Sequence, residues 1–409
     1  MKKKLSEELS WRGFVNQTTY TDLRKIDTTT ITFYWGVDPS ASSMTVGNLA
    51  IAMMVRHFID YGHKPVLLVG GATGLIGDPD GKTRERDLIT KEEVERNKAG
   101  IVAQYKQIFD GLDIEVVDNY DWFKDIGYLQ FLRDIGKHVP MRQMLGRDFV
   151  QSRLSEGGAG ISYAEFSYAL IQGYDFLHLH KKKGVDLQVC GSDQWGNSIA
   201  GVDLVRRLTG DAVHVWSAPL VVNKSTGTKF GKSEDGAIWL DNSLTSVYKF
   251  YQFWLNVDDI SVEDFLKIYT LLSKDEILAT MEQFQNDRGS RAAQKVLAFE
   301  VTKLVHGQKR AQTVKSASDA LFGQGRFHDL DEQAIKVLKQ ELPVVKASED
   351  IYDVLVSANL AQSKSEARTF VQSGAISLNG NKLTSDSVSF EPGNNILKRG
   401  KNACAIVVA

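Results

Sequence analysis

The sequence contains very little cysteine. Cys190 and Cys404 are the only two, and eight histidines are scattered through 409 residues without the spacing of a metal-ligand set. A disulfide framework needs paired cysteines, and structural zinc needs clustered cysteine or histidine, so we expect neither. We also expect no tightly bound protein metal. This composition favours a reducing, cytoplasmic compartment.

Long apolar runs are also missing. No uninterrupted stretch approaches the roughly 20 residues that span a bilayer. The basic start at residues 1–4 is followed by polar residues and not by the apolar core of a signal peptide. We therefore expect a soluble protein that does not interact with a membrane.

Neither sign of charge dominates. The formal net charge is −2, with 24% charged and 43% hydrophobic residues, which is ordinary for a globular protein. A length of 409 residues exceeds what one hydrophobic core usually holds, so two or three domains are expected. Because there is no global basic field, any contact with nucleic acid must come from local basic patches.

The N-terminal part of the chain has the pattern of a nucleotide-binding sheet. Residues 31–37 predict a strand, residues 46–61 an amphipathic helix, and the apolar run 65–69 a strand buried on both faces. A glycine-rich turn at 70–74 follows. Together they predict an α/β fold with a Rossmann-like, doubly wound parallel sheet. The sheet is expected to resume at 185–190, after a basic helical insertion.

Two segments have the composition of phosphate-binding loops. In residues 229–233, Lys229 and Lys232 lie three apart, and glycines keep the backbone flexible enough for both ammonium groups to approach a polyphosphate. Such a short run, taken alone, is more often a solvated surface turn. Residues 39–49 form a second segment rich in small and hydroxyl side chains. The presence of both favours ATP chemistry.

Three polar side chains share one face of a predicted helix. Tyr168, Gln172 and Asp175 are spaced by four and three residues, so they lie on one stripe. Polar groups inside a core are costly unless they find partners. The stripe therefore indicates either a satisfied structural network or, as we prefer, a pocket for a small zwitterion that carries a hydroxyl group.

Further polar residues follow two predicted strands. Asp78 comes after the turn at 70–74, where a carboxylate can bind an ammonium group; a simple tight connection is the alternative. Asp193 follows the strand at 185–190, and ligands bind outside the carboxyl ends of strands in such sheets. A carboxylate there suits ribose hydroxyls. The basic residues of the next loop, either solvated or facing a triphosphate, are Lys82, Arg84 and Arg86.

Together these segments resemble bacterial tyrosyl-tRNA synthetase, a class I aminoacyl-tRNA synthetase. Residues 229–233 are similar to the KMSKS signature, and residues 45–48 are similar to the HIGH signature with both histidines replaced, by Thr45 and Asn48. Trp35 is bulkier than the residue usually found beside the ribose. Residues 351–409 resemble the small RNA-binding fold named after ribosomal protein S-four.

The resemblance implies a tyrosine–tRNA ligase. Such an enzyme joins L-tyrosine to ATP to give tyrosyl-adenylate and pyrophosphate, and then transfers tyrosine to the 3′ end of tRNA(Tyr). ATP is a substrate, accompanied by Mg²⁺. The resemblance also implies a cytoplasmic homodimer that forms through the insertion, with Tyr163 at the interface.

The resemblance further implies roles for individual residues. The expected tyrosine-binding residues are Tyr34, Asp78, Asn119, Tyr168, Gln172, Asp175 and Gln194. The expected ATP-binding residues are Gly36, Asp38, Ser40, Gly47, Gly191, Asp193 and Lys232. The expected catalytic residues are Lys229, Lys232, Ser233, Thr45, Asn48, Lys82 and Arg86. The expected tRNA contacts are Arg206, Arg207, Lys364 and Arg368, with Lys398 and Arg399.

The expected domains are a catalytic domain at 1–222 with an insertion at about 119–160, the lysine loop with an α-helical domain at 223–322, a linker at 323–348, and an α+β RNA-binding domain at 349–409. Two other functions remain open. One is an amino-acid activator that no longer charges tRNA, and the other is an RNA-binding protein with a vestigial ATP site.

Overall fold

The computed structural model describes residues 4–79, 89–146, 148–233, 236–323, 325–386, 388–400 and 403–409, and only the backbone of residues 143, 148, 149, 232 and 233. Contacts divide the chain into two compact units. The first combines Met1–Thr245 with Val257–Ala293, and the second combines Ser246–Asn256 with Gln294–Ala409. Each unit has a main sheet of its own.

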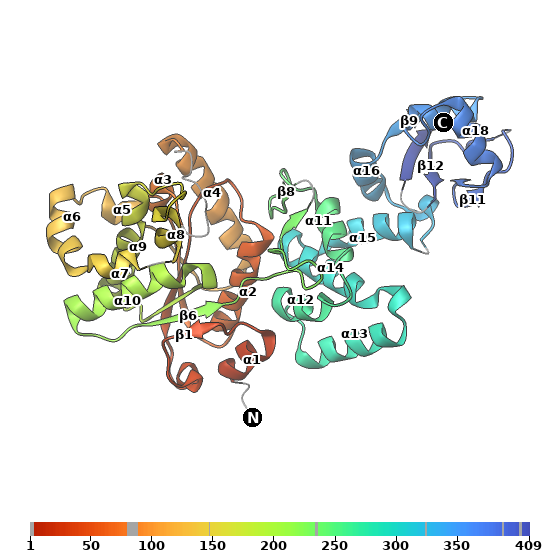
Figure 1. Ribbon diagram of the computed structural model, residues 1–409. Coiled ribbons are helices and arrows are strands. Elements are labelled where there is room, and N and C mark those ends of the chain that lie inside the picture. The colour runs from red at the N-terminus through yellow and green to blue at the C-terminus, as the bar shows by residue number, and fades with distance from the viewer. Residues whose placement is uncertain are drawn as a thin grey trace. The chain divides into compact units, whose positions relative to one another are not determined.

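The first unit is built on a parallel sheet with one antiparallel edge strand (Figure 1). From edge to edge its six strands are β1 (Gln17–Thr18), β6 (His214–Ala218), β5 (Leu187–Gly191), β2 (Thr32–Val37), β3 (Lys64–Val69) and β4 (Glu115–Asp118). From β2 the chain adds β3 and β4 on one side, and β5 and β6 on the other. The strand order therefore reverses between β2 and β5.

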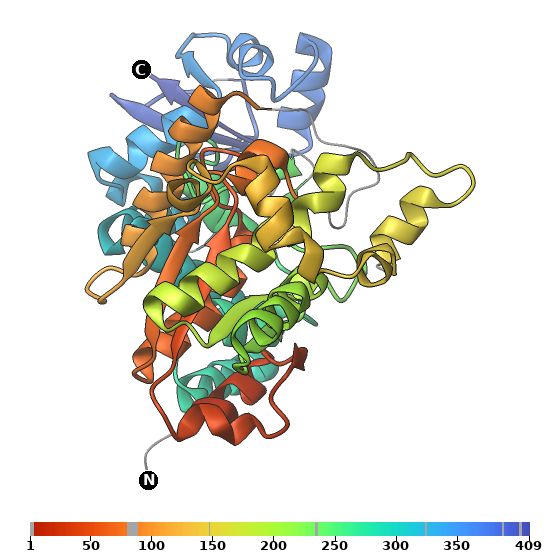
Figure 2. The ribbon, with the colours of Figure 1, turned by 90° about the vertical axis from the view of Figure 1, so that its left-hand side faces the viewer.

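Helices cover both faces of this sheet (Figures 1 and 2). The ring of Phe33 in β2 lies 5.2 Å from that of Phe58 in α2 (Val46–Asp60), and the next residue, Tyr34, faces α9 (Tyr163–Lys183). Because successive strand residues point to opposite faces, both sides of β2 are buried. The other helices of this unit outside the insertion are α1 (Leu5–Arg12), α3 (Thr73–Ile76), α4 (Lys91–Ile108), α10 (Trp195–Thr209), α12 (Val262–Tyr269) and α13 (Lys274–Asn286), with the 3₁₀ helices η1 (Leu23–Asp27), η3 (Ser192–Gln194) and η4 (Arg288–Ser290).

Between β4 and α9 the chain leaves the sheet, in the segment where the sequence predicts a helical insertion. Figure 2 shows its yellow part extending away from the sheet. The basic character expected of this segment comes from Arg133, Lys137 and Arg142, which are exposed, and from Arg147, which lies outside the described residues. The helices of the insertion are α5 (Tyr120–Phe123), α6 (Tyr128–Asp134), η2 (Gly136–His138), α7 (Met141–Leu145) and α8 (Asp148–Leu154).

The second unit joins a group of helices to a small sheet. The sheet runs β11 (Asn381–Lys382), β10 (Ile376–Leu378), β12 (Asn394–Arg399), β13 (Ala403–Val408) and β9 (Val344–Lys346). The helices are α11 (Val247–Leu255), α14 (Ala292–His306), α15 (Gln308–Phe322), η5 (Phe327–Asp329), α16 (Glu332–Glu341), α17 (Ile351–Ser357) and α18 (Lys364–Gln372). The two helices α17 and α18 share a buried apolar cluster with β10, β12 and β13.

Two elements of the C-terminal sequence carry recognisable local signals. Ser363 caps α18 by accepting a hydrogen bond from the backbone N–H of Glu366 at 3.2 Å. Asn379 and Gly380 adopt φ of 50° and 89° in the turn between β10 and β11, as expected for a tight hairpin.

The segment expected to be a linker, 323–348, is instead largely folded. It contains α16 and β9, and β9 pairs in parallel with β13, so the C-terminal sheet begins before residue 349. The backbone carbonyl of Pro343 accepts a hydrogen bond from Ile406 at 2.9 Å. Proline cannot donate to a ladder but is tolerated where an edge strand begins, so Pro343 marks a strand boundary and not a linker.

The predicted fold class, an α/β protein with a Rossmann-like sheet followed by helices and a small α+β part, is confirmed. Among the described residues, no helix is both long enough and apolar enough to cross a bilayer.

Candidate active site

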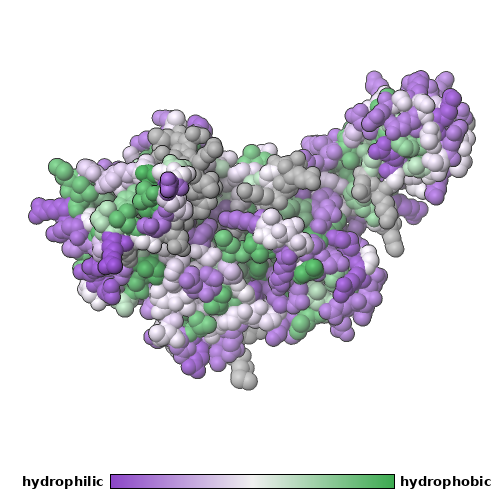
Figure 3. Space-filling model, viewed as in Figure 1, coloured by the Kyte–Doolittle hydropathy of each residue, from purple (hydrophilic) through white to green (hydrophobic). Residues whose placement is uncertain are grey.

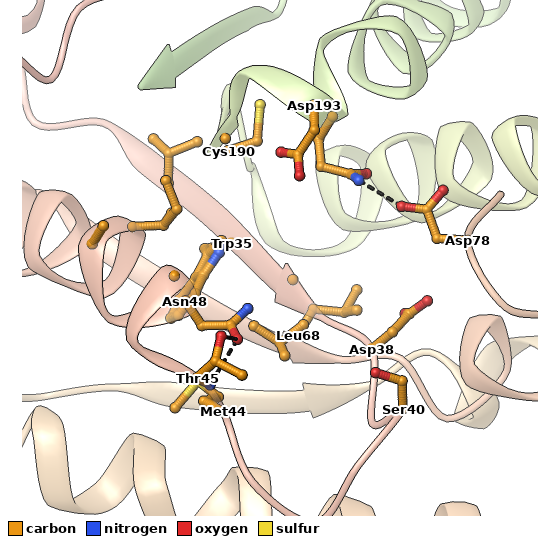
Figure 4. Close-up of a pocket in the computed structure, with 18 of the residues that line it drawn as sticks. Trp35, Asp38, Ser40, Met44, Thr45, Asn48, Leu68, Asp78, Cys190 and Asp193 are labelled. Carbon is orange, nitrogen blue, oxygen red and sulfur yellow. Dashed lines mark hydrogen bonds between the residues drawn. The ribbon is translucent and has the colours of Figure 1, made fainter. Parts of the chain in front are cut away.

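A cavity of about 360 Å³ lies at the carboxyl ends of β2 and β5, where the strand order reverses. Ligands bind at this position in open α/β sheets. Figure 4 shows side chains from both strands and from α2 pointing into it. The predicted site residues that line it are Tyr34, Gly36, Asp38, Ser40, Thr45, Gly47, Asn48, Asp78, Tyr168, Gln172, Asp175, Gly191, Asp193, Gln194 and Lys229.

A buried carboxylate forms one end of the cavity. Asp175 is only 2% exposed, and it accepts hydrogen bonds from Asn119 Nδ2 at 3.1 Å and from Trp122 Nε1 at 2.9 Å. Burial raises the pKa of its carboxyl to about 8, against the opposing effect of these two bonds. Asn119 does not line the cavity itself but holds this carboxylate. A ligand hydroxyl that donates to Asp175 would favour its ionised form.

The hydroxyl of Tyr34 lies at the same end. It is fully buried and has no hydrogen-bond partner among the described residues. A buried hydroxyl without a partner costs free energy that a bound ligand can recover. Burial, reinforced by the charge of Asp175, raises the pKa of the Tyr34 phenol. This end of the cavity is therefore suited to a ligand that carries its own hydroxyl group.

Amide and carboxylate groups meet at the rim of this pocket. Gln194 donates from Nε2 to Asp78 Oδ2 at 2.5 Å, the contact drawn to Asp78 in Figure 4. Asn197, which is 1% exposed, donates to Gln194 Oε1 at 3.2 Å and reaches Asp78 Oδ1 at 3.5 Å. The three side chains form one cluster, in which Asp78 and Gln194 line the cavity. Such a cluster can bind an ammonium group.

A second carboxylate, Asp38, lines the cavity and binds side chains from two other elements. It accepts from Tyr168 Oη at 2.7 Å and from Thr73 Oγ1 at 2.6 Å, and Asn119 donates to the same threonine hydroxyl at 3.1 Å. A Cβ on Gly70 would come within 2.1 Å of Asp38 Oδ1 and 2.2 Å of Thr73 Oγ1. The glycine-rich turn is thus needed so that this network can approach the backbone.

The two predicted phosphate-binding segments lie against each other. The backbone N–H of Val46, the first residue of α2, donates to Ile238 at 3.0 Å, and Ile238 in turn donates to Gly231 at 3.0 Å. Lys232–Ser233 (β7) pairs with Gly236–Ala237 (β8) in a short hairpin. The lysine segment is therefore joined through Ile238 to the N-terminus of α2, where backbone N–H groups favour anions.

Lys229 extends from this segment across the cavity. Its Nζ lies 3.7 Å from Asp193 Oδ2, and both side chains are partly exposed. Phe230 anchors the segment by packing its ring 4.1 Å from that of Phe265 in α12. The side chains of Lys232 and Ser233, and the whole of Lys82 and Arg86, lie outside the described residues.

The residues expected to contact tRNA do not line the cavity. Arg206 pairs with Asp203 at 2.8 Å, and Arg207 is exposed beside it at the end of α10. Lys364 bridges Asp350 at 2.9 Å and Asp353 at 2.7 Å, and the guanidinium of Arg368 lies 5.4 Å from the ring of Tyr352.

Two further basic residues of the C-terminal sheet make contacts inside the second unit. Lys398 donates to the carbonyl oxygens of Ala320 and Leu321 at the end of α15. The guanidinium of Arg399 lies 5.0 Å from the ring of Phe370. Lys398 in particular already has protein partners, so of this pair Arg399 is the better candidate for an external ligand.

Several site residues were not found from the sequence. Trp122 and Thr73 reach the site only through the packing of the insertion and the turn, so no local pattern reveals them. Asn197 follows Gln194 by three residues, a spacing that places both on one face of a helix, and this signal could have found it. Gln188 lines the cavity from β5, and its Oε1 is buried without a partner among the described residues.

No group of three or more histidine, cysteine, aspartate or glutamate side chains in the described part of the chain could hold a metal ion. The acidic groups of the cavity are instead spread around its wall, as suits contacts to an organic ligand.

Known proteins match the chain along nearly its whole length. The family model for tRNA synthetases class I (W and Y) matches residues 26–323, and the model for the tyrosine–tRNA ligase SYY-like C-terminal domain matches residues 334–406. A tyrosine–tRNA ligase of Geobacillus kaustophilus is 46% identical over 388 residues, which cover 93% of this chain and 92% of that protein. One of Chromobacterium violaceum is 42% identical over 417 residues, which cover 98% of each.

Solved structures agree with these matches. A C-terminally truncated mitochondrial tyrosyl-tRNA synthetase of Aspergillus nidulans superposes with a TM-score of 0.71 at 31% identity, covering 78% of this chain and 95% of that chain. A tryptophanyl-tRNA synthetase of Encephalitozoon cuniculi, with a TM-score of 0.55 at 13% identity over 76% of this chain and 88% of that one, shares the fold alone. The chain therefore belongs to the class I tRNA synthetases of the tryptophan and tyrosine group, in which its relatives of matching length are tyrosine–tRNA ligases.

Proposed function

We propose that this chain is a tyrosine–tRNA ligase that activates L-tyrosine with ATP and then charges tRNA(Tyr). The observation that carries this proposal is the pairing of two unlike ends in one cavity. A buried carboxylate and an unpartnered phenol, Asp175 and Tyr34, form one end. The N-terminus of α2 and Lys229 form the other.

The substrate phenol lies between Tyr34 and Asp175 in this proposal. It accepts from the tyrosine hydroxyl of the protein and donates to the carboxylate, so both groups gain a partner. Phenylalanine would leave the Tyr34 hydroxyl without a partner and Asp175 without this additional donor, and an unsatisfied buried polar group costs about 1–3 kcal/mol. The substrate ammonium binds Asp78 with Tyr168 and Gln172, and Gln194 lies near the substrate carboxylate.

ATP occupies the other end. The ribose hydroxyls bind Asp193 beside Gly191, and the chain near Gly36, Asp38, Ser40 and Gly47 borders the rest of the nucleotide. Mg²⁺ arrives with ATP as part of the substrate. The charges of Lys229 and Lys232, with Lys82 and Arg86, balance the negative triphosphate.

The tyrosine carboxylate oxygen attacks the α-phosphorus of ATP in line. An oxygen–phosphorus bond forms, the bond from the α-phosphorus to the bridging oxygen breaks, and pyrophosphate leaves. No protein nucleophile takes part: Cys190 lines the cavity, but burial raises the pKa of its thiol to about 12. Catalysis consists of positioning the two substrates and stabilising charge on the leaving pyrophosphate, with Ser233 and the two lysines of the loop.

The terminal ribose hydroxyl of tRNA(Tyr) then attacks the tyrosyl carbonyl and releases AMP. Arg206 and Arg207 on the first unit, and Arg368 and Lys364 on the second, contact phosphates of the tRNA. Lys364 exchanges its bonds to Asp350 and Asp353 for a phosphate in this step. We place the protein in the cytoplasm, where its tRNA substrate is found.

We also propose a homodimer formed through an apolar groove between the insertion and the N-terminal half of α9. The groove has a volume of about 340 Å³ and is bordered by Tyr128, Tyr163 and other apolar residues. Tyr128 and Tyr163 are each 62% exposed, and Leu129 beside them is 79% exposed. Figure 3 shows green, hydrophobic residues interspersed with purple ones at the end of the molecule where α6 lies. Exposure of large apolar groups in one place marks an interaction surface.

Two assays test the function. Purified protein should exchange labelled pyrophosphate into ATP only when L-tyrosine is present, and it should charge a tRNA(Tyr) transcript with tyrosine. Exchange without charging would indicate an activator that has lost tRNA transfer. The absence of both would leave an RNA-binding protein with a vestigial ATP site and would refute the proposal.

A further inference from the structure

Thr45 and Asn48, which replace the two histidines of the HIGH signature, are bonded to each other. The backbone N–H and the hydroxyl of Thr45 both donate to Oδ1 of Asn48, each at 2.9 Å. A backbone N–H donates only to the oxygen of an amide, so this bond settles which end of the Asn48 side chain faces Thr45. Figure 4 shows the amide nitrogen on the opposite side, pointing away from Thr45.

The Asn48 side-chain nitrogen, Nδ2, is consequently free to donate a hydrogen bond to a ligand. Both residues line the cavity, and Nδ2 of Asn48 has no hydrogen-bond partner among the described residues. It projects from the first turn of α2, a helix of 15 residues whose N-terminal N–H groups already favour negative charge. The single proton of the Thr45 hydroxyl is committed to Asn48, so Thr45 cannot donate to a phosphate while this bond lasts.

We propose that Thr45 is a positioning residue that fixes the Asn48 amide, and that Asn48 Nδ2, and not the Thr45 hydroxyl, donates to an oxygen of the bound nucleotide. This inference rests on the proposed function, because it requires ATP in the cavity. It replaces the expectation that both side chains contact the nucleotide.

A double-mutant cycle tests the coupling between the two residues. Thr45→Val removes the hydroxyl at nearly constant shape and should raise the KM for ATP roughly 2- to 10-fold in tyrosine-dependent pyrophosphate exchange. The kcat and the KM for tyrosine should change little. Thr45→Ser restores the hydroxyl and should recover most of the loss. In an Asn48→Ala background, Thr45→Val should have no further effect, because its action passes through the missing amide.

Two other variants separate this role from helix capping. Asn48→Asp keeps the acceptor for Thr45 but replaces Nδ2 by an oxygen, so the melting temperature should be retained while the KM for ATP rises. Ser273→Ala is the matched control in α13, since the backbone N–H and hydroxyl of Ser273 likewise donate to one oxygen of Glu276, both at 2.7 Å. It should lower the melting temperature by roughly 2–4 °C and leave the KM for ATP unchanged.

The outcomes are distinct. Additive effects of Thr45→Val and Asn48→Ala, a fall in kcat at constant KM for ATP, or an unchanged KM for ATP in Thr45→Val or Asn48→Asp would each overturn the inference. If the unaltered chain shows no tyrosine-dependent exchange, the proposed function fails instead.

Discussion

In the ligand-free protein, Asp175 should determine how the free energy of unfolding changes with pH. Its pKa is raised from 3.8 to about 8, mainly by burial. A carboxyl whose pKa is higher in the folded than in the unfolded chain adds stability below the unfolded value, and this contribution is lost as the pH rises through the folded value. The unfolding free energy should therefore fall between about pH 4 and pH 8. In Asp175→Asn this part of the decline should disappear, as urea titrations at several pH values would measure.

Asp211 offers a comparison of opposite sign. Its hydrogen bond with His180 lowers the pKa of this exposed carboxyl. Its contribution is present above the unfolded pKa and is lost as the pH falls through the lower folded value. Asp211→Asn should thus remove a contribution that is constant between about pH 4 and 8, so it should leave the slope of the unfolding free energy in that interval as it is and change the pH dependence only in acid. If Asp175→Asn retained the full decline in that interval, the assignment of the decline to Asp175 would be wrong.

Trp122 should matter for tyrosine through Asp175. Trp122→Phe removes the Nε1 donor and keeps an aromatic ring next to His178, whose ring centre lies 4.5 Å away. Because one bond to the buried carboxylate is lost, the KM for tyrosine should rise by roughly 10-fold, about 1.4 kcal/mol, while the KM for ATP stays near its original value. Steady-state exchange kinetics measure both. An equal rise in the two constants would show general damage to the cavity.

Some residues of the site can be predicted from the sequence, and others cannot. Tyr168 and Asp175 are found because helical spacing places them on one stripe, and Asp193 because it follows a buried strand. Trp122 and Thr73 act through contacts to residues more than 30 positions away, to Asp175 and Asp38, so their roles depend on how distant segments meet. No local sequence pattern predicts which distant segments come into contact.

The lysine segment is the element on which the first reaction step depends. It is joined to the N-terminus of α2 through Ile238 and anchored by Phe230 on α12, and Lys229 lines the cavity. Lys232→Ala should reduce the rate of adenylate formation about 10²-fold, or ~3 kcal/mol, because one charge contact to the leaving pyrophosphate is lost. Pre-steady-state rates measure this effect, and the affinity for tyrosine should stay nearly constant.

Lys224 supplies the control for this element. It belongs to the same stretch of chain but pairs with Asp264 and does not line the cavity. Lys224→Ala should therefore leave the rate of adenylate formation close to that of the unaltered chain. A large loss of tyrosine affinity in Lys232→Ala would contradict the role proposed for the loop.

Elements with strong local signals were predicted well. The strand at 31–37 has β-branched and aromatic residues that pack on both faces, so its composition suffices. The strand β9 was missed because it is short, half exposed, and held only by pairing with β13 from the end of the chain. Its identity comes from that distant partner and not from its own three residues.

At the scale of the whole molecule, the groove beside α6 and α9 exposes apolar side chains that we expect a partner surface to cover. The hydroxyls of Tyr128 and Tyr163 lie 3.4 Å apart at its border, and apolar residues of α5, α6 and α9 form its walls. A two-fold symmetric dimer places the same patch on both partners, so one groove can cover the other. Among the described residues no charged side chain borders the groove, which favours another apolar surface over a charged ligand.

We therefore expect the protein to sediment as a dimer at micromolar concentration. Tyr163→Asp would bury an unpaired charge in each copy of the interface, at a cost of roughly 3 kcal/mol or more, and should raise the dimer dissociation constant at least about 10²-fold. Sedimentation equilibrium measures this change. Leu278→Asp, on the exposed side of α13 and outside the groove, should leave the dimer intact. Monomeric behaviour of the unaltered chain would mean that the groove serves another partner.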